Sequence, residues 1–190
     1  TCSGAKIKDA VLMSNKEEDY DVKNPQARGE ESESYNESIY LDFLPGYRLQ
    51  ENFIKRNKPQ IVTMSMGGND IGFSSIIAKC VTQVAQDCYH YYEDRKELVN
   101  NINSQYPQLL RMYQSLQQSA ATDAKIYIIG YPQIAKADGD CAINVHFSNT
   151  EVIFGNQLIN YLNSVIEKAA DAAGVYYVDV EDAFVGHRLC

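Results

Sequence analysis

The amino-acid sequence predicts an α/β fold in which a parallel sheet is covered by helices on both faces. Three short runs, at residues 60–66, 125–130 and 175–180, are rich in β-branched, aromatic and other apolar residues and have the length of buried strands. Long segments with apolar residues at helical spacing lie between the runs. Strands that alternate with helices usually return to one sheet in parallel, so the pattern indicates three layers, α/β/α.

The first long helical pattern follows the predicted strand at 60–66. Its apolar residues recur every three or four positions between Leu98 and Leu116, which is the spacing of one helix face. Pro107 interrupts this pattern. Because proline lacks a backbone N–H and its ring collides with the preceding turn, we expect the helix to kink or restart near Tyr106.

A second helical pattern lies between the second and third predicted strands. Its apolar stripe runs from Ile153 to Ala169. Ser148 and Glu151 have the spacing of a capping box, in which each side chain binds the backbone N–H of the other residue. Gly174 follows the stripe and suits the left-handed turn that ends many helices. The helix is therefore expected to begin after Ser148 and to end before Gly174.

Residues 14–40 differ in composition from the rest of the chain. The segment is acidic and poor in aliphatic residues, and it carries turn formers, so we expect a surface excursion. No long polar linker divides the 190 residues, and this length suits one domain with a substantial core. A single domain is therefore expected over residues 1–190.

Charge and hydropathy argue against two classes of partner. The formal net charge is −8, and no cluster of lysine and arginine is present to bind a phosphate backbone or an anionic membrane. No apolar run approaches the roughly 18 to 20 residues of a membrane-spanning helix. We expect neither a nucleic-acid partner nor a membrane span.

The five cysteines are Cys2, Cys80, Cys88, Cys141 and Cys190, with no CxxC pair and no histidine at zinc-finger spacing. Zinc binding is therefore not expected. We expect two disulfides, Cys80–Cys88 and Cys141–Cys190, with Cys2 left over; five free buried thiols are the alternative. Two disulfides indicate a secreted or cell-surface protein, because the cytosol keeps thiols reduced.

Candidate chemical groups follow two of the predicted strands, at the ends where α/β sheets bind ligands. Gly67, Gly68 and Asn69 follow the first strand, and His187 follows the third. If these strands lie near each other, Asn69 and His187 share a crevice. Acyl transfer needs such groups, an amide that stabilises an oxyanion and an imidazole that moves a proton. The two glycines would allow a tight turn and leave room for a substrate. Taken alone, Asn69 is more typical of a turn residue that binds its own backbone.

Three segments of the chain resemble sequence blocks of a known family, and they follow one another along the chain in the order of that family. GGND at 67–70 resembles the Gly-x-Asn-Asp block of the SGNH (GDSL) hydrolases. DAFVGHRLC at 182–190 resembles the C-terminal histidine block of their secreted, disulfide-containing esterase and lipase branch, and TCSGA at 1–5 resembles a Cys-Ser-Gly-Ala segment of that branch. The resemblance implies a flavodoxin-like α/β/α fold and hydrolysis of carboxylic esters through an acyl-enzyme, with no cofactor and no metal.

The resemblance also implies roles for individual residues. Gly4 provides a backbone N–H and Asn69 a side-chain N–H to the oxyanion, and His187 acts as the general base. The nucleophile of the family is the serine of a Gly-Asp-Ser block, which occurs nowhere in these 190 residues. The resemblance therefore implies that this serine and the first strand of the sheet lie upstream of Thr1. Ser3 belongs to the block that supplies the glycine N–H, and we do not expect it to be the nucleophile.

The acid that orients the histidine departs from the family pattern. Many members place an aspartate three residues before the histidine, but Phe184 occupies that position, and Asp182 lies five residues before His187. Asp182 and a backbone carbonyl are both candidates for the orienting role. Asp70 and Asp179 are expected to be structural, holding a turn and a strand end by hydrogen bonds.

The sequence favours an enzyme over a binding protein. The expected substrate is a small-molecule, glycan or lipid ester, and the fold does not choose among these. A non-catalytic SGNH-like surface binding module is the alternative, supported by the acidic excursion and by the absent nucleophile. The presence of both Asn69 and His187 argues against that alternative, because a binding module needs neither.

Overall fold

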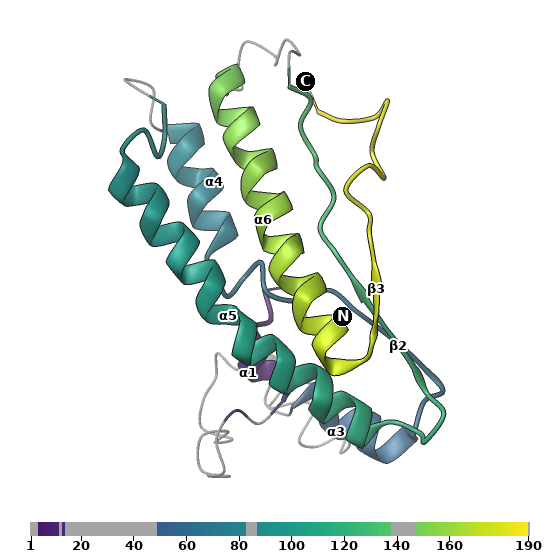
Figure 1. The fold of residues 1–190 in the computed structure, drawn as a ribbon. Helices are drawn as coiled ribbons and strands as arrows, with labels where there is room; N and C mark the ends of the chain where they lie inside the picture. The colour runs from purple at the N-terminus through teal and green to yellow at the C-terminus, as the bar shows by residue number, and fades with distance from the viewer. Residues whose placement is uncertain (1–3, 12, 14–48, 83–86, 138–146, 190) are drawn as a thin grey trace, which may run out of the picture.

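The structure is a computed structural model that describes residues 4–11, 13, 49–82, 87–137 and 147–189 (Figure 1). The excursion expected at 14–40 and the disulfide expected between Cys141 and Cys190 lie outside these residues, as does Cys2. The described helices and strands are α1 (Ile7–Ala10), α3 (Gln50–Asn57), β1 (Ile61–Met64), α4 (Phe73–Thr82), α5 (Tyr92–Ser119), β2 (Lys125–Ile129), α6 (Asn149–Ala173) and β3 (Tyr176–Val178).

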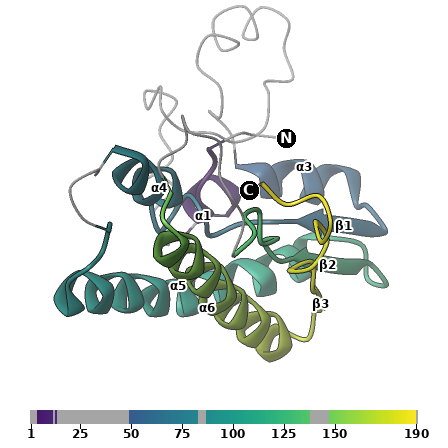
Figure 2. The ribbon, with the colours of Figure 1, turned by 90° about the horizontal axis from the view of Figure 1, so that it is seen from above.

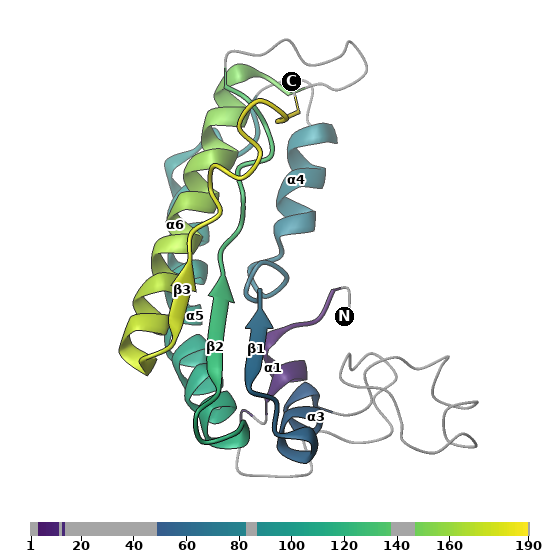
Figure 3. The same cartoon turned by 90° about the vertical axis from the view of Figure 1, so that its right-hand side faces the viewer.

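Three parallel strands form one sheet in the order β1-β2-β3. The register pairs Ile61 with Lys125, and Tyr127 with Tyr176. Each strand lies inside one of the runs predicted from the sequence and is shorter than that run. The predicted α/β class with a parallel sheet is confirmed. The carboxyl ends of the three strands point the same way, toward one edge of the sheet (Figure 3).

Helices cover one face of this sheet in the described part of the chain. Val62, Ile126 and Ile128 are buried in the core that α5 and α6 also line, and these two helices lie behind the sheet in Figure 3. Helix α3 lies beside β1 (Figure 2). On the opposite face, Ile61 is 64% exposed and Tyr176 is 55% exposed. Strands expected to be buried on both faces are thus buried on one, and the second helical layer remains a prediction.

Helix α5 continues across Pro107 without a break, so the predicted restart near Tyr106 is wrong. A proline inside a helix costs about 3 kcal/mol. Burial of one large apolar side chain stabilises by about 1.5 to 3 kcal/mol. The turns after the proline bury Leu109, Met112 and Leu116 completely. Packing of this face therefore outweighs the backbone cost of the proline.

Both predicted ends of helix α6 are confirmed. The Ser148 hydroxyl accepts the Glu151 N–H at 3.1 Å, and the Glu151 carboxylate accepts the Ser148 N–H at 3.0 Å. At the other end, Gly174 adopts φ +72° and its N–H donates to the Asp171 carbonyl at 3.0 Å. The capping box and the glycine thus begin and end the helix where the local sequence indicates.

Helices α5 and α6 are the longest described helices, and they pack along each other (Figure 1). Their buried stripes include Leu116 and Ile166, which are completely buried. This pair forms much of the core behind the sheet. No helix within the described ranges has the length and apolar character that crossing a bilayer requires.

Candidate active site

The loop after β1 carries Asn69, the predicted oxyanion donor. Gly67 adopts φ +115°, a backbone conformation that residues with a side chain rarely adopt. The N–H groups of Asp70 and Ile71 donate to the Gly67 carbonyl at 3.1 and 3.2 Å. The chain therefore reverses tightly at the carboxyl end of the strand, and Asn69 lies within this turn.

The side chain of Asn69 binds the N-terminal segment rather than its own turn. Its Nδ2 atom donates to the Ala5 carbonyl at 2.9 Å, across 64 positions of sequence. Gly4, the predicted backbone donor, directly precedes Ala5, is exposed and adopts φ +76°. The structure thus brings together the two segments that carry the predicted oxyanion donors. A carboxamide has two N–H bonds, so the second hydrogen of Nδ2 is not used by this contact.

Asp70 holds the start of helix α1. Its carboxylate accepts the Ile7 N–H at 3.1 Å and 3.3 Å to the two oxygens. Burial raises the pKa of Asp70 to about 6, against the opposing effects of the Ile7 N–H and the nearby positive charge of Lys6. Asn69 and Asp70 therefore fix two neighbouring points of one segment, the carbonyl of Ala5 and the N–H of Ile7.

Replacement of Asp70 by asparagine should remove a pH-dependent part of the stability. The folded chain binds a proton at Asp70 with a pKa of about 6, compared with the ordinary value of 3.8. The folded state therefore holds the proton more tightly than the unfolded state between these values. The wild-type free energy of unfolding should fall as pH rises from about 4 to about 6, by at most about 3 kcal/mol and by less because the carboxyl is partly solvated.

Urea denaturation of both proteins at pH 4 and pH 7 measures this difference. The free energy of unfolding of Asp70→Asn, relative to that of the wild type, should increase as pH rises. Asp123→Asn, at an exposed position outside the loop, serves as the control. Parallel pH curves for Asp70→Asn and the wild type would contradict the expectation.

Gly68 makes room for Tyr131, which follows β2. Its N–H donates to the Tyr131 hydroxyl at 2.9 Å. A Cβ at Gly68 would lie 3.0 Å from the same oxygen, and the tyrosine ring is equally close. Burial raises the pKa of Tyr131, while hydrogen bonds from Gly68 and Ser65 oppose the rise. The space that the sequence assigns to a substrate beside this glycine is thus occupied by the Tyr131 side chain.

The predicted base, His187, lies in the C-terminal segment after β3 and is exposed. This segment runs beside the chain that follows β2 (Figure 3). The Gln133 N–H donates to the Glu181 carbonyl at 3.0 Å, and the Leu189 N–H donates to the Ile134 carbonyl at 2.7 Å. Backbone pairing with the β2 continuation therefore sets the path of the histidine segment.

Asn69 and His187 follow strands that are not neighbours in the sheet. Strand β2 separates β1 from β3, so the two segments leave the same edge of the sheet with one strand between them. No hydrogen bond joins the two side chains within the part of the chain that the structure describes. The crevice that the sequence predicts for Asn69 and His187 remains a prediction.

Asp182, the predicted orienting acid, binds a different partner. Its side chain is 85% exposed and forms an ion pair with Arg188 at 2.7 Å. Among the described residues, no hydrogen bond or ion pair joins Asp182 to the His187 side chain. Asp179 accepts the Glu181 N–H at 2.8 Å and so holds the backbone at the end of β3. The orienting role of Asp182 remains a prediction.

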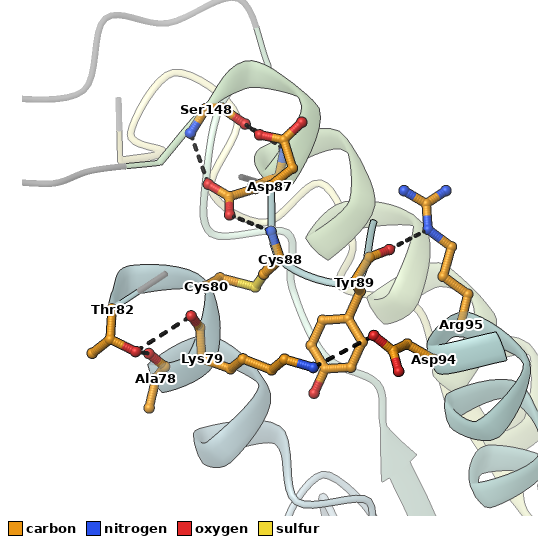
Figure 4. Close-up of a disulfide and its surroundings, with 11 residues drawn as sticks. Ala78, Lys79, Cys80, Thr82, Asp87, Cys88, Tyr89, Asp94, Arg95 and Ser148 are labelled. Carbon is orange, nitrogen blue, oxygen red and sulfur yellow. Dashed lines mark hydrogen bonds and ion pairs between the residues drawn. A yellow bond between two sulfur atoms is a disulfide. The ribbon is translucent and has the colours of Figure 1, made fainter. Parts of the chain in front are cut away.

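A disulfide joins Cys80 of α4 to Cys88, the pair expected from the sequence (Figure 4). The Cys88 N–H donates to the buried Glu151 carboxylate at 2.8 Å. Asp87 accepts the Ser148 hydroxyl at 2.7 Å. Sulfur and carboxylate atoms of Cys80, Cys88 and Glu151 lie within 4.8 Å of one another. Because the sulfurs are bonded to each other, this group presents no thiolate to a metal and instead ties the disulfide to the start of α6.

Two residues near the candidate site, Tyr131 and Asn163, were not predicted from the sequence. Asn163 lies on α6 within the apolar stripe, between Ile159 and Ile166, and is only 2% exposed. It binds both backbone polar groups of Tyr131. A polar residue on the apolar face of a predicted helix was the available signal, because a buried amide requires hydrogen-bond partners.

This chain is similar to known lipases and to a lipase/acylhydrolase family. A profile of the GDSL-like Lipase/Acylhydrolase family matches residues 20–190, a range that does not include Gly4. Lipase 1 of Streptomyces coelicolor is 32% identical over 130 residues, which are 68% of this chain and 46% of that protein. Lipase of Streptomyces rimosus is 28% identical over 130 residues, which are 68% of this chain and 47% of that protein. The chain thus spans about half the length of these curated relatives.

Two solved structures share the fold. The extracellular lipase from Streptomyces rimosus superposes with a TM-score of 0.55 at 26% sequence identity, over 69% of this chain and 54% of that chain. Phospholipase A1 from Streptomyces albidoflavus superposes with a TM-score of 0.55 at 29% identity, over 69% of this chain and 53% of that chain.

Proposed function

Since this chain belongs to the GDSL-like lipase/acylhydrolase family, we propose that the intact protein is a serine ester hydrolase that works through an acyl-enzyme. One observation carries the proposal: the Asn69 carboxamide lies against the segment of Gly4 and Ala5, beside the loop at the carboxyl end of β1. A carboxamide N–H and a backbone N–H presented together are the donors that an oxyanion hole needs.

The proposed reaction uses a nucleophilic serine, a base and two oxyanion donors, all from this chain or its extension. A serine upstream of Thr1 attacks the ester carbonyl carbon, and His187 accepts the hydroxyl proton. Gly4 and Asn69 donate hydrogen bonds to the carbonyl oxygen as it becomes negatively charged. His187 then protonates the leaving alcohol, and water hydrolyses the acyl-serine by the same route. The absence of Gly-Asp-Ser from the 190 residues supports an upstream serine. Asp182 or a backbone carbonyl orients His187.

Among ester substrates, a lipid ester fits the described surface better than a glycan ester. Three apolar side chains within three residues of His187 in the sequence are open to solvent: Phe184 is 44% exposed, Val185 61% and Leu189 66%. Exposed apolar side chains favour contact with an acyl chain over contact with a sugar. The relatives named as lipases and as a phospholipase A1 agree with this choice. An extracellular location is proposed from the Cys80–Cys88 disulfide and the extracellular lipase of Streptomyces rimosus.

A fluorophosphonate probe and p-nitrophenyl butyrate test the proposal. The intact protein should hydrolyse the ester and bind the probe covalently at the upstream serine, and replacement of that serine by alanine should abolish both. The 190-residue chain alone should show no turnover above background. Robust hydrolysis by this chain that is lost in Ser3→Ala would overturn the assignment of the nucleophile.

A non-catalytic binding module is the second candidate. The absence of a Gly-Asp-Ser block from the 190 residues favours it, because a binding module does not need the serine. The residue encoded at the serine position upstream of Thr1 distinguishes the two functions. A Gly-Asp-Ser block after a strand supports the hydrolase, whereas another residue in place of the serine supports the binding module.

A further inference from the structure

The side chain of Asn163 is buried in the middle of helix α6 and makes three hydrogen bonds, using both hydrogens of its amide. Its Oδ1 atom accepts the Tyr131 N–H at 2.8 Å. Its Nδ2 atom donates to the Tyr131 carbonyl at 2.8 Å and to the Glu181 carboxylate at 3.2 Å. One carboxamide therefore holds both backbone groups of Tyr131, two residues after β2, much as a neighbouring strand would, and also holds the segment after β3.

The contact with Tyr131 extends to the oxyanion loop. The hydroxyl of the same tyrosine accepts the N–H of Gly68, which directly precedes Asn69. Asn163 is thus connected to the loop after β1 through Tyr131, because Asn163 binds the Tyr131 backbone and the Tyr131 hydroxyl binds Gly68. The space at Gly68 is filled by the tyrosine ring, so a shift of this ring displaces the loop or leaves a gap beside it.

The contact with Glu181 extends to the histidine segment. The Glu181 carbonyl accepts the Gln133 N–H at 3.0 Å and Arg188 Nη2 at 3.3 Å. Arg188 directly follows His187. Asn163 is therefore joined through one residue to the backbone and side chains that set the course of the chain around the histidine.

A packing role alone does not account for this arrangement. A leucine would have the same number and branching of side-chain heavy atoms as Asn163, although more volume, and would complete the apolar stripe of α6. Gly130 permits the close approach: a Cβ there would lie 3.1 Å from Asn163 Oδ1 and 2.5 Å from the Tyr177 hydroxyl. The second amide hydrogen of Asn163 binds Glu181, which lies after β3, so this hydrogen bond does not serve to hold the end of β2.

We propose that Asn163 is a positioning residue that fixes the oxyanion loop and the histidine segment relative to each other. This proposal rests on the proposed ester hydrolysis. Asn163 touches neither substrate nor reacting atoms, and it acts through Tyr131 and Glu181. Because misplacement of catalytic groups by about 1 Å can cost on the order of 100-fold in rate, loss of this contact should affect turnover more than substrate affinity.

Kinetics of Asn163→Leu in the intact protein test the proposal. We expect kcat for p-nitrophenyl butyrate to fall about 100-fold, with KM changed by less than about threefold. Glu181→Ala, at a half-buried position in the C-terminal segment, removes one partner without altering the core and should lower kcat about 10-fold. Val165→Ala is the matched control, because it truncates a buried apolar side chain of the same helix that makes no hydrogen bond to Tyr131 or Glu181. Its kcat should stay within about twofold of the wild type.

Hydrogen exchange provides a readout that does not depend on activity. Asn163→Leu should increase deuterium uptake in residues 67–70 and 181–187 together, whereas Val165→Ala should not increase it selectively there. Wild-type kcat and unchanged exchange in Asn163→Leu would overturn the positioning role, as would an equal loss of kcat in Val165→Ala. If Asn163→Leu does not fold, Glu181→Ala decides by the same two measurements. Absence of ester hydrolysis by the wild-type intact protein would instead reject the proposed function, and the exchange data would still test the coupling.

Discussion

Replacement of His187 by alanine in the intact protein is expected to lower kcat for ester hydrolysis by about 10⁴- to 10⁶-fold. In serine hydrolases the base removes the proton of the nucleophile and returns it to the leaving group, so its loss disables both halves of the reaction. The side chain is exposed, and no hydrogen bond or ion pair fixes it among the described residues. Stability should therefore change little, and the thermal midpoint should match that of the wild type.

His90→Ala is the matched control for this experiment. His90 is also an exposed histidine, but it lies in the turn before α5, where its ring packs edge-on against Tyr91 at 5.5 Å. Its removal should leave kcat unchanged. If His187→Ala retained more than about a tenth of the wild-type kcat, the base would have to be another group, and the family-based role of His187 would be wrong.

Replacement of Asn69 by alanine is expected to have the second largest effect. Removal of one oxyanion donor typically lowers kcat by about 10²- to 10³-fold, or about 2.7 to 4 kcal/mol of transition-state stabilisation. KM should change little, because the donor binds the charged oxygen more strongly than the ground-state carbonyl. The variant also loses the bond to the Ala5 carbonyl, which should cost about 1 kcal/mol of folding stability.

Asn57→Ala separates the catalytic effect from the loss of stability. Asn57 donates to the Phe53 carbonyl at 2.9 Å on the exposed surface of α3, so this variant also removes a side-chain to backbone hydrogen bond. Initial rates with p-nitrophenyl butyrate, measured well below the thermal midpoint of each variant, give kcat and KM. Equal losses of kcat in the two variants would show that Asn69 acts only on stability.

Local patterns in the sequence predicted the three strands and helix α6 well. The strands were found within the predicted apolar runs, and the Ser148 capping box and the glycine at 174 define α6 as expected. Such features depend on residues a few positions apart, so their physical cause is visible in a short window of sequence. The predicted break at Pro107 failed because burial against the rest of the core outweighs a local backbone preference.

The arrangement of the candidate site was harder to predict because its contacts are long-range. Asn69 binds Ala5 across 64 positions, Gly68 binds Tyr131 across 63, and Asn163 binds Tyr131 across 32. No spacing rule indicates which loop will meet which helix at such separations. The strand order, which places β2 between the oxyanion loop and the histidine segment, is likewise a tertiary property. Residue types at strand ends therefore indicated candidate chemistry, but not their mutual distances.

The order β1-β2-β3 also bears on how the chain behaves toward other copies of itself. One side of β1 and one side of β3 have no partner strand among the described residues. An unpaired strand side presents N–H and C=O groups that can template pairing with another polypeptide. Ile61 and Tyr176, both more than half exposed, lie on these two strands and add apolar surface to the open borders. A further strand that paired with either border would lengthen the sheet and shield it from self-association, so that completion of the fold and protection against aggregation would be achieved by the same contact.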